Sequence, residues 1–289
     1  MQNLKTKEDY IAYLKEKARE IRIKGLKLIT AGNIGHPGAT LSSADLFAAL
    51  YFSVLSINPA NPAWDGRDRF ILSKGHGCPP LYVALAIKGY YSWEELLSTY
   101  GKLHSRFQGH PDMKKTPGVD MTTGSLGQGL SVAVGMALAA RRDGKKHRVY
   151  CMLGDGELDE GQIWEAVMSA AHYKLDNIIA IVDYNKIQAK GPVHEIMGLE
   201  PLPAKWGSFG WQVIEIDGHD MENILDAFYL AKNRYNNGKP IVIIAHTVKG
   251  KGVSFMENTP EWHTHAPSKE QLEAALVELS AYGDYRWKN

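Results

Sequence analysis

The chain has 289 residues, of which 44% are hydrophobic and 22% charged, so it can bury a large core as one big domain or two small ones. Its net charge of +1 gives no electrostatic basis for binding nucleic acid or an anionic membrane, and its two cysteines cannot form a disulfide framework. No apolar run approaches membrane-spanning length and the charged N-terminus lacks a signal-peptide core, so we expect a cytoplasmic protein without nucleic-acid or membrane partners.

Apolar patterning predicts helices that alternate with strands along most of the chain. Helices are predicted at residues 4–30, from a Ser42–Asp45 cap to Tyr51, and at 80–87, 130–140, 162–168, 227–234 and 269–280. Short apolar strands are predicted at 69–72, 148–153, 177–182, 211–216 and 241–245. This alternation implies an α/β fold, in which a mainly parallel sheet has helices on both faces. The sequence contains no obvious internal linker, so we expect a single domain over residues 1–289.

The central motif is the GDG turn at residues 154–156, which follows the predicted strand at 148–153. A strand, a glycine turn and a helix present backbone N–H groups to a phosphate, yet Asp155 in this turn would repel one. A hard divalent cation such as Mg²⁺ removes the conflict, because it binds carboxylate and phosphate oxygens together. Asn185 ends the next strand and would add a neutral oxygen at the same edge of the sheet, where open α/β sheets bind ligands.

Other interpretations of this turn are weaker or remain open. The dinucleotide fingerprint G-x-G-x-x-G fails because Asp159 stands at its sixth position, and no P-loop motif occurs. An ordinary turn in which Asp155 caps the following helix is the remaining alternative.

Four loops combine histidine with glycine or proline: GHPG at 35–38, GHG at 75–77, GHP at 109–111 and WHTH at 262–265. Glycine and proline fix a tight backbone, and histidine titrates near neutrality, so four such loops indicate a site for proton transfer and phosphate binding. Zinc is the competing interpretation, but neither HxxxH nor HExxH spacing occurs.

As a set, these motifs resemble transketolase, in its N-terminal, diphosphate-binding domain, over nearly the whole chain. The motifs that carry the resemblance are GHPG at 35–38, DRFILSKGH at 68–76, TTGSLGQG at 122–129, GDG at 154–156 with Glu160 and Gly161, and Asn185. The resemblance implies a three-layer α/β/α fold that binds thiamine diphosphate through a divalent metal, which agrees with the cation inferred above.

The resemblance also implies roles for individual residues. Asp155, Asn185 and the carbonyl of Ile187 would hold Mg²⁺, or another divalent cation such as Ca²⁺ or Mn²⁺. Contacts with the cofactor are implied for His76, Gly124, Ser125, Leu126, Gly156, Glu157, Asn185 and His263. Proton transfer during carbon–carbon bond cleavage and formation is implied for His36, His76, His110 and His263. The choice of His263 over His265 follows from the Trp-His pair, and it stays open. Glu160 would be either an interface acid or a first-turn helix acid.

One departure from the family pattern concerns length. Single-chain transketolases run to more than twice this length, and their second domain supplies the glutamate that activates the cofactor together with aromatic residues around its ring. The resemblance is therefore to the N-terminal subunit of a split transketolase, which would need a separate C-terminal, pyrimidine-binding subunit. We expect a dimer of heterodimers that acts on sugar phosphates, and a chain that is inactive or nearly so by itself.

Two alternative functions stay open at this point. One is the N-terminal half of another thiamine diphosphate enzyme, such as a 1-deoxyxylulose-5-phosphate synthase-like protein. The other is a non-catalytic cofactor-binding module. The donor and acceptor sugars are not predicted from the sequence.

Overall fold

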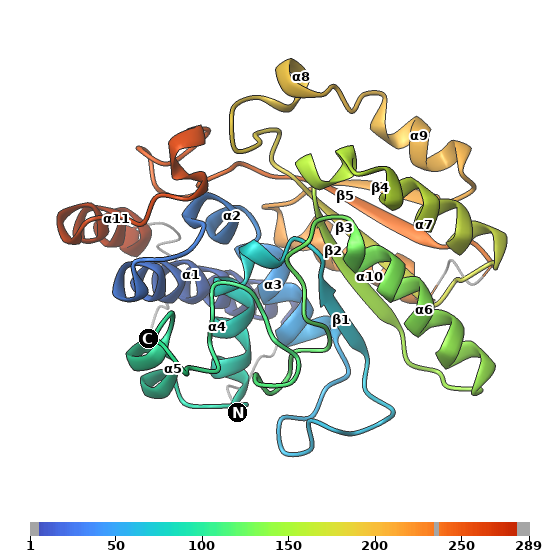
Figure 1. Ribbon diagram of the computed structural model, residues 1–289, viewed down its shortest axis with the longest axis horizontal. Coiled ribbons are helices and arrows are strands. Elements are labelled where there is room, and N and C mark those ends of the chain that lie inside the picture. The colour runs from blue at the N-terminus through green and yellow to red at the C-terminus, as the bar shows by residue number, and fades with distance from the viewer. Residues whose placement is uncertain (1–5, 234–236, 282–289) are drawn as a thin grey trace.

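The computed structural model describes residues 6–233 and 237–281, which form a parallel sheet between two layers of helices (Figure 1). Five strands lie in the order β1-β2-β3-β5-β4, and every neighbouring pair is parallel. The strands are β1 (Arg69–Leu72), β2 (Val149–Gly154), β3 (Ile178–Tyr184), β4 (Gln212–Asp217) and β5 (Ile241–His246). The predicted α/β class and the parallel sheet are therefore confirmed.

Helices cover both faces of the sheet, as the alternation of buried strand residues requires. One face carries Tyr150 and Met152 of β2 and packs against α1 (Lys7–Gly32), α3 (Ala44–Ala49), α4 (Pro79–Lys88), α5 (Trp93–Thr99) and α10 (Met221–Asn233). The other face carries Cys151 and Leu153 and packs against α6 (Gln128–Arg142), α7 (Gly161–His172), α8 (Val193–Ile196) and α9 (Leu202–Ser208). This arrangement confirms the three-layer α/β/α architecture.

The remaining helices lie beside these layers. Helix α2 (Pro37–Ser42) and helix α11 (Lys269–Ala281) enclose a third, smaller apolar cluster with α1. Short turns of helix occur at η1 (Leu50–Val54, a π-helix), η2 (Gly75–Gly77), η3 (Gly156–Asp159) and η4 (Pro260–His263).

The predicted helix start at residues 42–45 is confirmed in its position, because α3 begins at Ala44 with Ser43 at its N-cap, but the predicted capping hydrogen bond is wrong. A further helix that was not predicted, α2, begins at Pro37, because proline is preorganised for the first helical position. The hydroxyls of Ser42 and Ser43 do not cap a helix: they donate to the Asp183 carboxylate and to the Ala39 carbonyl, each at 2.7 Å. The predicted loop at 35–38 is therefore shorter, since Pro37 and Gly38 belong to α2.

The other differences concern boundaries and short helices. Helix α10 begins six residues before the predicted 227, and the end of that prediction at residue 234 and the start of the first helix at residue 4 lie outside the described residues. Helices α5, α8 and α9 were not predicted. Within the described residues no helix is both long and apolar enough to span a membrane.

Candidate active site

A cavity of about 340 Å³ opens at the carboxyl ends of β2 and β3. Its walls include ten of the predicted site residues: His36, His76, Gly124, Leu126, Asp155, Gly156, Glu157, Asn185, Ile187 and His263. Six further lining residues were not predicted as site residues: Ala39, Lys74, Gly154, Gln188, Ala189 and Lys249. Parallel strands thus bring residues more than two hundred positions apart to one edge of the sheet.

The GDG turn places a buried carboxylate in this cavity. Asp155 caps the short helix η3, and its Oδ1 accepts the Gly156 N–H at 2.8 Å while its Oδ2 accepts the N–H of Lys186. Burial, with a smaller contribution from Asp183, raises the pKa of Asp155 to about 7. Asp155 therefore caps a helix and faces the cavity at the same time, and among the described residues its carboxylate forms no ion pair.

Asp183, at the end of β3, does have such a partner. Its carboxylate is fully buried and binds the Lys74 ammonium, which is only 2% exposed. Burial alone would raise the pKa of Asp183, but Lys74 and hydrogen bonds from Thr247 and Ser42 hold it below its usual value. This buried ion pair joins the loop after β1 to the sheet directly beneath the cavity.

Lys249 is a second buried cation that the sequence pattern did not reveal. Its Nζ donates to the Ile187 carbonyl at 2.8 Å and contacts the His263 Nδ1 at 2.9 Å. Burial, together with the nearby Lys74, lowers the pKa of Lys249 to about 8. In the sequence this residue belongs only to a glycine-rich loop, KGKG, and its function depends on that loop crossing the ends of the strands.

The predicted metal ligands share this cavity. No group of three or more His, Cys, Asp or Glu side chains that could hold a metal occurs in the described parts of the chain. The predicted set differs in kind, with one carboxylate (Asp155), one amide (Asn185) and one carbonyl (Ile187), a donor set that suits Mg²⁺ with phosphate oxygens. The Lys249 ammonium already lies on the Ile187 carbonyl, so this cradle of oxygens attracts positive charge in the structure itself.

Three of the four predicted histidines touch one another. The ring centroids of His36 and His76 are 4.7 Å apart, and those of His36 and His263 are 5.2 Å apart. His110 lies beside Gly124, where an added Cβ would stand 2.9 Å from its ring. The buried Nδ1 of His36 has no hydrogen-bond partner among the described residues, as expected of a group that faces a ligand.

The imidazoles of His36, His76 and His263 have pKa values well below their usual range and are neutral at neutral pH. Burial lowers the pKa of His36 to about 4, with help from His110 and Lys249. Burial and the neighbouring His36 and Lys74 lower the pKa of His76 to about 2, and burial and Lys249 lower that of His263 to about 3. Each ring can therefore donate a proton at one nitrogen and accept one at the other.

The unfolding free energy of the cofactor-free chain is expected to fall as the pH drops from about 6.5 to about 4, by about 1 kcal/mol per pH unit for each of His36 and His76. The folded state keeps these rings neutral over that range, whereas the unfolded state binds protons, so acid favours unfolding. Urea denaturation at several pH values should show a shallower dependence in a His36→Gln/His76→Gln variant. His172→Gln, which alters an exposed histidine, is the control, and an unchanged slope in the double variant would contradict the expectation.

The remaining predicted residues lie at the edge of the cavity or outside it. Ser125 is exposed and does not line it, and His265 is exposed and packs against Trp262. The choice of His263 over His265 agrees with this placement, although its role stays a prediction. Glu160 is exposed at the start of α7 and makes no capping hydrogen bond, which leaves its two interpretations open.

Glu157 lines the cavity, but its carboxylate is already engaged. It accepts hydrogen bonds from the Ser73 hydroxyl, the Gly127 N–H at 2.9 Å and the Gly154 N–H at 3.0 Å. It therefore joins three segments: the loop after β1, the loop before α6 and the end of β2. Its predicted contact with the cofactor is untested.

Comparison with known proteins assigns this architecture to a family. Residues 14–282 match the family model described as transketolase, thiamine diphosphate binding domain. The chain belongs to the transketolase family.

Relatives of two lengths resemble this transketolase-family chain. It is 48% identical to the 6-deoxy-6-sulfo-D-fructose transketolase subunit SqwG of Clostridium sp. (strain MSTE9), over 93% of this chain and 97% of that protein. It is 44% identical to an apulose-4-phosphate transketolase subunit of Phocaeicola vulgatus, over 88% and 89% of the two chains. The transketolase structure from Campylobacter jejuni superposes with a TM-score of 0.87 at 37% identity, covering 92% of this chain but 42% of that one.

Proposed function

We propose that this chain is the thiamine diphosphate- and Mg²⁺-binding subunit of a two-subunit transketolase, which transfers a two-carbon ketol unit from a ketose phosphate to an aldose. The observation that carries the proposal is the single cavity in which Asp155, Asn185 and Ile187 lie beside Lys249 and three histidines. Bound thiamine diphosphate supplies the carbon nucleophile and electron sink that ketol transfer requires.

The residues of this chain would bind the charged end of the cofactor. Asp155, Asn185 and the Ile187 carbonyl would hold the divalent cation between themselves and the phosphates. The Lys249 ammonium, buried in the same wall, would add a positive charge toward the diphosphate. At Gly156 an added Cβ would stand 2.8 Å from the Gln188 side chain, so glycine lets that side chain pack against the turn.

The neutral histidines would handle protons of the sugar. His36, His76 and His263 lie in contact, and each can accept a proton from a hydroxyl or return it to an oxygen as the carbon–carbon bond breaks and forms. Their low pKa values suit transient protonation, because a buried imidazolium beside Lys249 readily gives its proton back.

A second subunit would complete the site. The two relatives that match this chain over most of their length are named as transketolase subunits, whereas the chain covers 42% of the single-chain human transketolase at 39% identity. The partner would be a C-terminal, pyrimidine-binding subunit that contributes the activating glutamate. We propose a dimer of heterodimers, located in the cytoplasm.

Reconstitution is the experiment that tests this function. Ketol transfer from xylulose 5-phosphate to ribose 5-phosphate would be measured with Mg²⁺ and thiamine diphosphate for this chain, for a candidate C-terminal subunit, and for the two mixed. Because the named relatives act on different sugars, 6-deoxy-6-sulfofructose and apulose 4-phosphate belong in the donor panel. Turnover is expected only in the mixture.

The same experiment separates the alternatives. Full activity of this chain alone would show that no residue from a partner is needed. A mixture that binds the cofactor but transfers no ketol unit would favour a non-catalytic module. Product from pyruvate and glyceraldehyde 3-phosphate would favour a 1-deoxyxylulose-5-phosphate synthase-like function, although the relatives compared above are named as transketolases.

His219 should affect cofactor affinity through Lys249, which it does not touch. Its Nε2 accepts the Val248 N–H at 2.9 Å, so its Nδ1 carries the proton and donates to Asp45 at 2.8 Å. Asp45 is in turn held by the buried Arg22. This chain of contacts fixes the backbone next to Lys249. His219→Asn keeps a donor in the place of Nδ1 but loses the acceptor for the Val248 N–H. It is expected to weaken thiamine diphosphate binding about tenfold.

His219→Gln is the matched control, because its amide oxygen can replace Nε2 as the acceptor for Val248, so its effect should be smaller. Calorimetric affinities would also be measured in a Lys249→Met background. There His219→Asn should cause no further loss. Additive losses would show that His219 acts on the cofactor by another route.

A further inference from the structure

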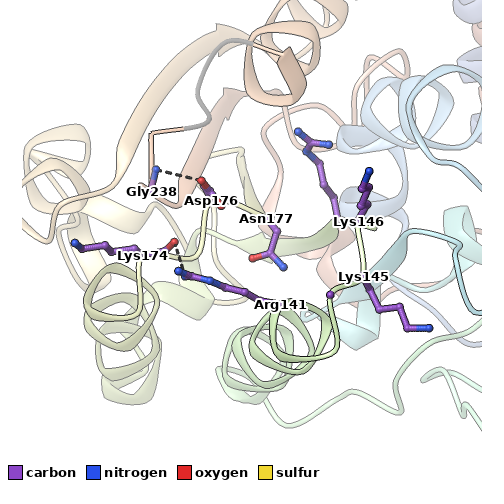
Figure 2. A pocket seen from close by; sticks show the side chains of 9 residues that line it. Arg141, Lys145, Lys146, Lys174, Asp176, Asn177 and Gly238 are labelled. Atoms are coloured by element: carbon purple, nitrogen blue, oxygen red, sulfur yellow. Dashed lines mark hydrogen bonds between the residues drawn. The ribbon is translucent and has the colours of Figure 1, made fainter.

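A second cavity, of about 460 Å³ and lined by basic residues, lies at the amino ends of the strands, opposite the catalytic cavity (Figure 2). The proposed catalytic function does not involve it. It is formed where α6 ends and where β2 and β3 begin. The six residues of β2 and the seven of β3 separate it from the catalytic cavity by about 20 Å. Its ligand would therefore not be the cofactor or the sugar in the catalytic site.

Positive charge is concentrated around this cavity. Five cationic side chains and one acidic side chain line it: Arg141, Lys145, Lys146, Arg148, Lys174 and Asp176. The whole chain carries a net charge of only +1, so the remainder is acidic. Most of the cations come from the run RRDGKKHR at residues 141–148, which the proposed function does not use.

Two of these cations are fixed in position by backbone carbonyls. Arg141 donates to the Tyr173 carbonyl at 2.6 Å and to that of Lys174 at 3.1 Å, and Arg148 donates to the Lys232 carbonyl. Carbonyls orient a guanidinium without neutralising its charge, so Arg141 keeps its positive charge for an anion in the cavity. The helix dipole favours Arg141 in the last turn of α6, but Arg148 and Lys146 lie beyond that turn.

The lysines surround this fixed pair. Figure 2 shows the side chains of Lys174 and Lys145 on opposite sides of the cavity, with Arg141 between them. Lys145 pairs with Asp65, whereas within the described residues the ammonium groups of Lys146 and Lys174 have no hydrogen bond or ion pair. The one acid, Asp176, accepts the Gly238 N–H at 3.1 Å, and its single negative charge leaves the five cations in excess.

We infer that this cavity binds a small, non-aromatic ligand that carries at least two phosphate groups. Separate cations on opposite sides suit two or more phosphates better than one, and a volume of a few hundred Å³ is typical of a small-molecule site. No aromatic side chain is among the described residues that line it, so a nucleobase would find no surface for stacking. A sugar bisphosphate and inorganic triphosphate share the chemistry that the cavity recognises.

Titration calorimetry on the full chain tests this inference, with inorganic triphosphate, fructose 1,6-bisphosphate, orthophosphate and single-stranded oligonucleotide as probes. It would be run with and without thiamine diphosphate and Mg²⁺, at low and high salt. The variant is Lys146→Ala/Lys174→Ala. It removes two exposed lysines whose ammonium groups pair with no acid among the described residues, so no carboxylate loses its partner. Lys27→Ala/Lys269→Ala removes the same charge from exposed positions elsewhere and is the matched control.

Saturable binding of triphosphate or bisphosphate, stronger than that of orthophosphate and weakened about tenfold in the Lys146→Ala/Lys174→Ala variant alone, supports the inference. The stronger of the two probes identifies the source of the phosphates. Equal weakening in the control variant, or tighter binding of the oligonucleotide, overturns it. Because binding is expected whether or not the cofactor is present, its loss would not affect the proposed transketolase function.

Discussion

Asp155→Asn should abolish Mg²⁺-dependent binding of thiamine diphosphate while leaving the cofactor-free chain folded. Loss of an outer-shell partner of a metal typically costs 10–100-fold in affinity, so loss of a ligand is expected to cost at least about 100-fold. The substitution also removes a carboxylate whose ionisation is disfavoured by burial and by Asp183. It also removes one hydrogen-bond acceptor. The two carboxylate oxygens accept the Gly156 and the Lys186 N–H groups, and an amide has only one oxygen to do so.

These two changes in stability oppose each other, so the unfolding free energy should change by less than about 1 kcal/mol. Calorimetry and urea denaturation on the same preparation measure both quantities. Asp226→Asn, on the exposed side of α10, is the matched control and should change neither. Undiminished cofactor binding by Asp155→Asn would remove this residue from the metal site, and a large loss of stability would make its role structural.

Lys74→Met should cause the largest loss of stability. It leaves the Asp183 carboxylate, which is 0% exposed, without its cation, and breaking a buried pair in this way costs about 3–5 kcal/mol. Serine and threonine hydroxyls would still donate to Asp183, but they supply no charge. Chemical denaturation of the cofactor-free chain measures the loss.

The double variant Lys74→Met/Asp183→Asn should recover most of this stability, because it removes the stranded charge as well. Lys7→Met provides the comparison at an exposed pair. Its ammonium binds Glu222, both side chains are more than half exposed, and the loss should be much smaller than that of Lys74→Met. If the double variant were no more stable than Lys74→Met, the cost would lie in packing around Lys74 and not in charge.

The sheet could be predicted from the sequence because its strands are short apolar runs with a single interpretation. Residues 69–72 were assigned without error, and β3 begins and ends within two residues of the prediction. The segment after Pro37 could be predicted only in part, because helix α2 has no local signal of its own. There Ser42 donates to Asp183, a partner 141 positions away, and Ser43 donates to the Ala39 carbonyl, so the local pattern placed the start of α3 but not the partners of its serines.

The residues of the candidate site also fall into those that a local sequence pattern marks and those that only the tertiary structure reveals. Asp155, Asn185 and the histidine loops were found because glycine and proline mark them locally and because parallel strands end at one edge. Lys249 and Lys74 have no such mark, since each is one lysine in a glycine-containing loop until tertiary structure buries it. His219 is further removed, because its effect passes through the backbone of Val248.

The three segments joined by Glu157 have a thermodynamic consequence for ligand binding. Because a carboxylate of the chain itself already orders the segments at Ser73, Gly127 and Gly154, a cofactor need not order them when it arrives. The conformational entropy of that part of the wall is lost during folding and not during association. Affinity at this site should therefore depend mainly on how slowly the ligand leaves, and not on a slow rearrangement before it enters.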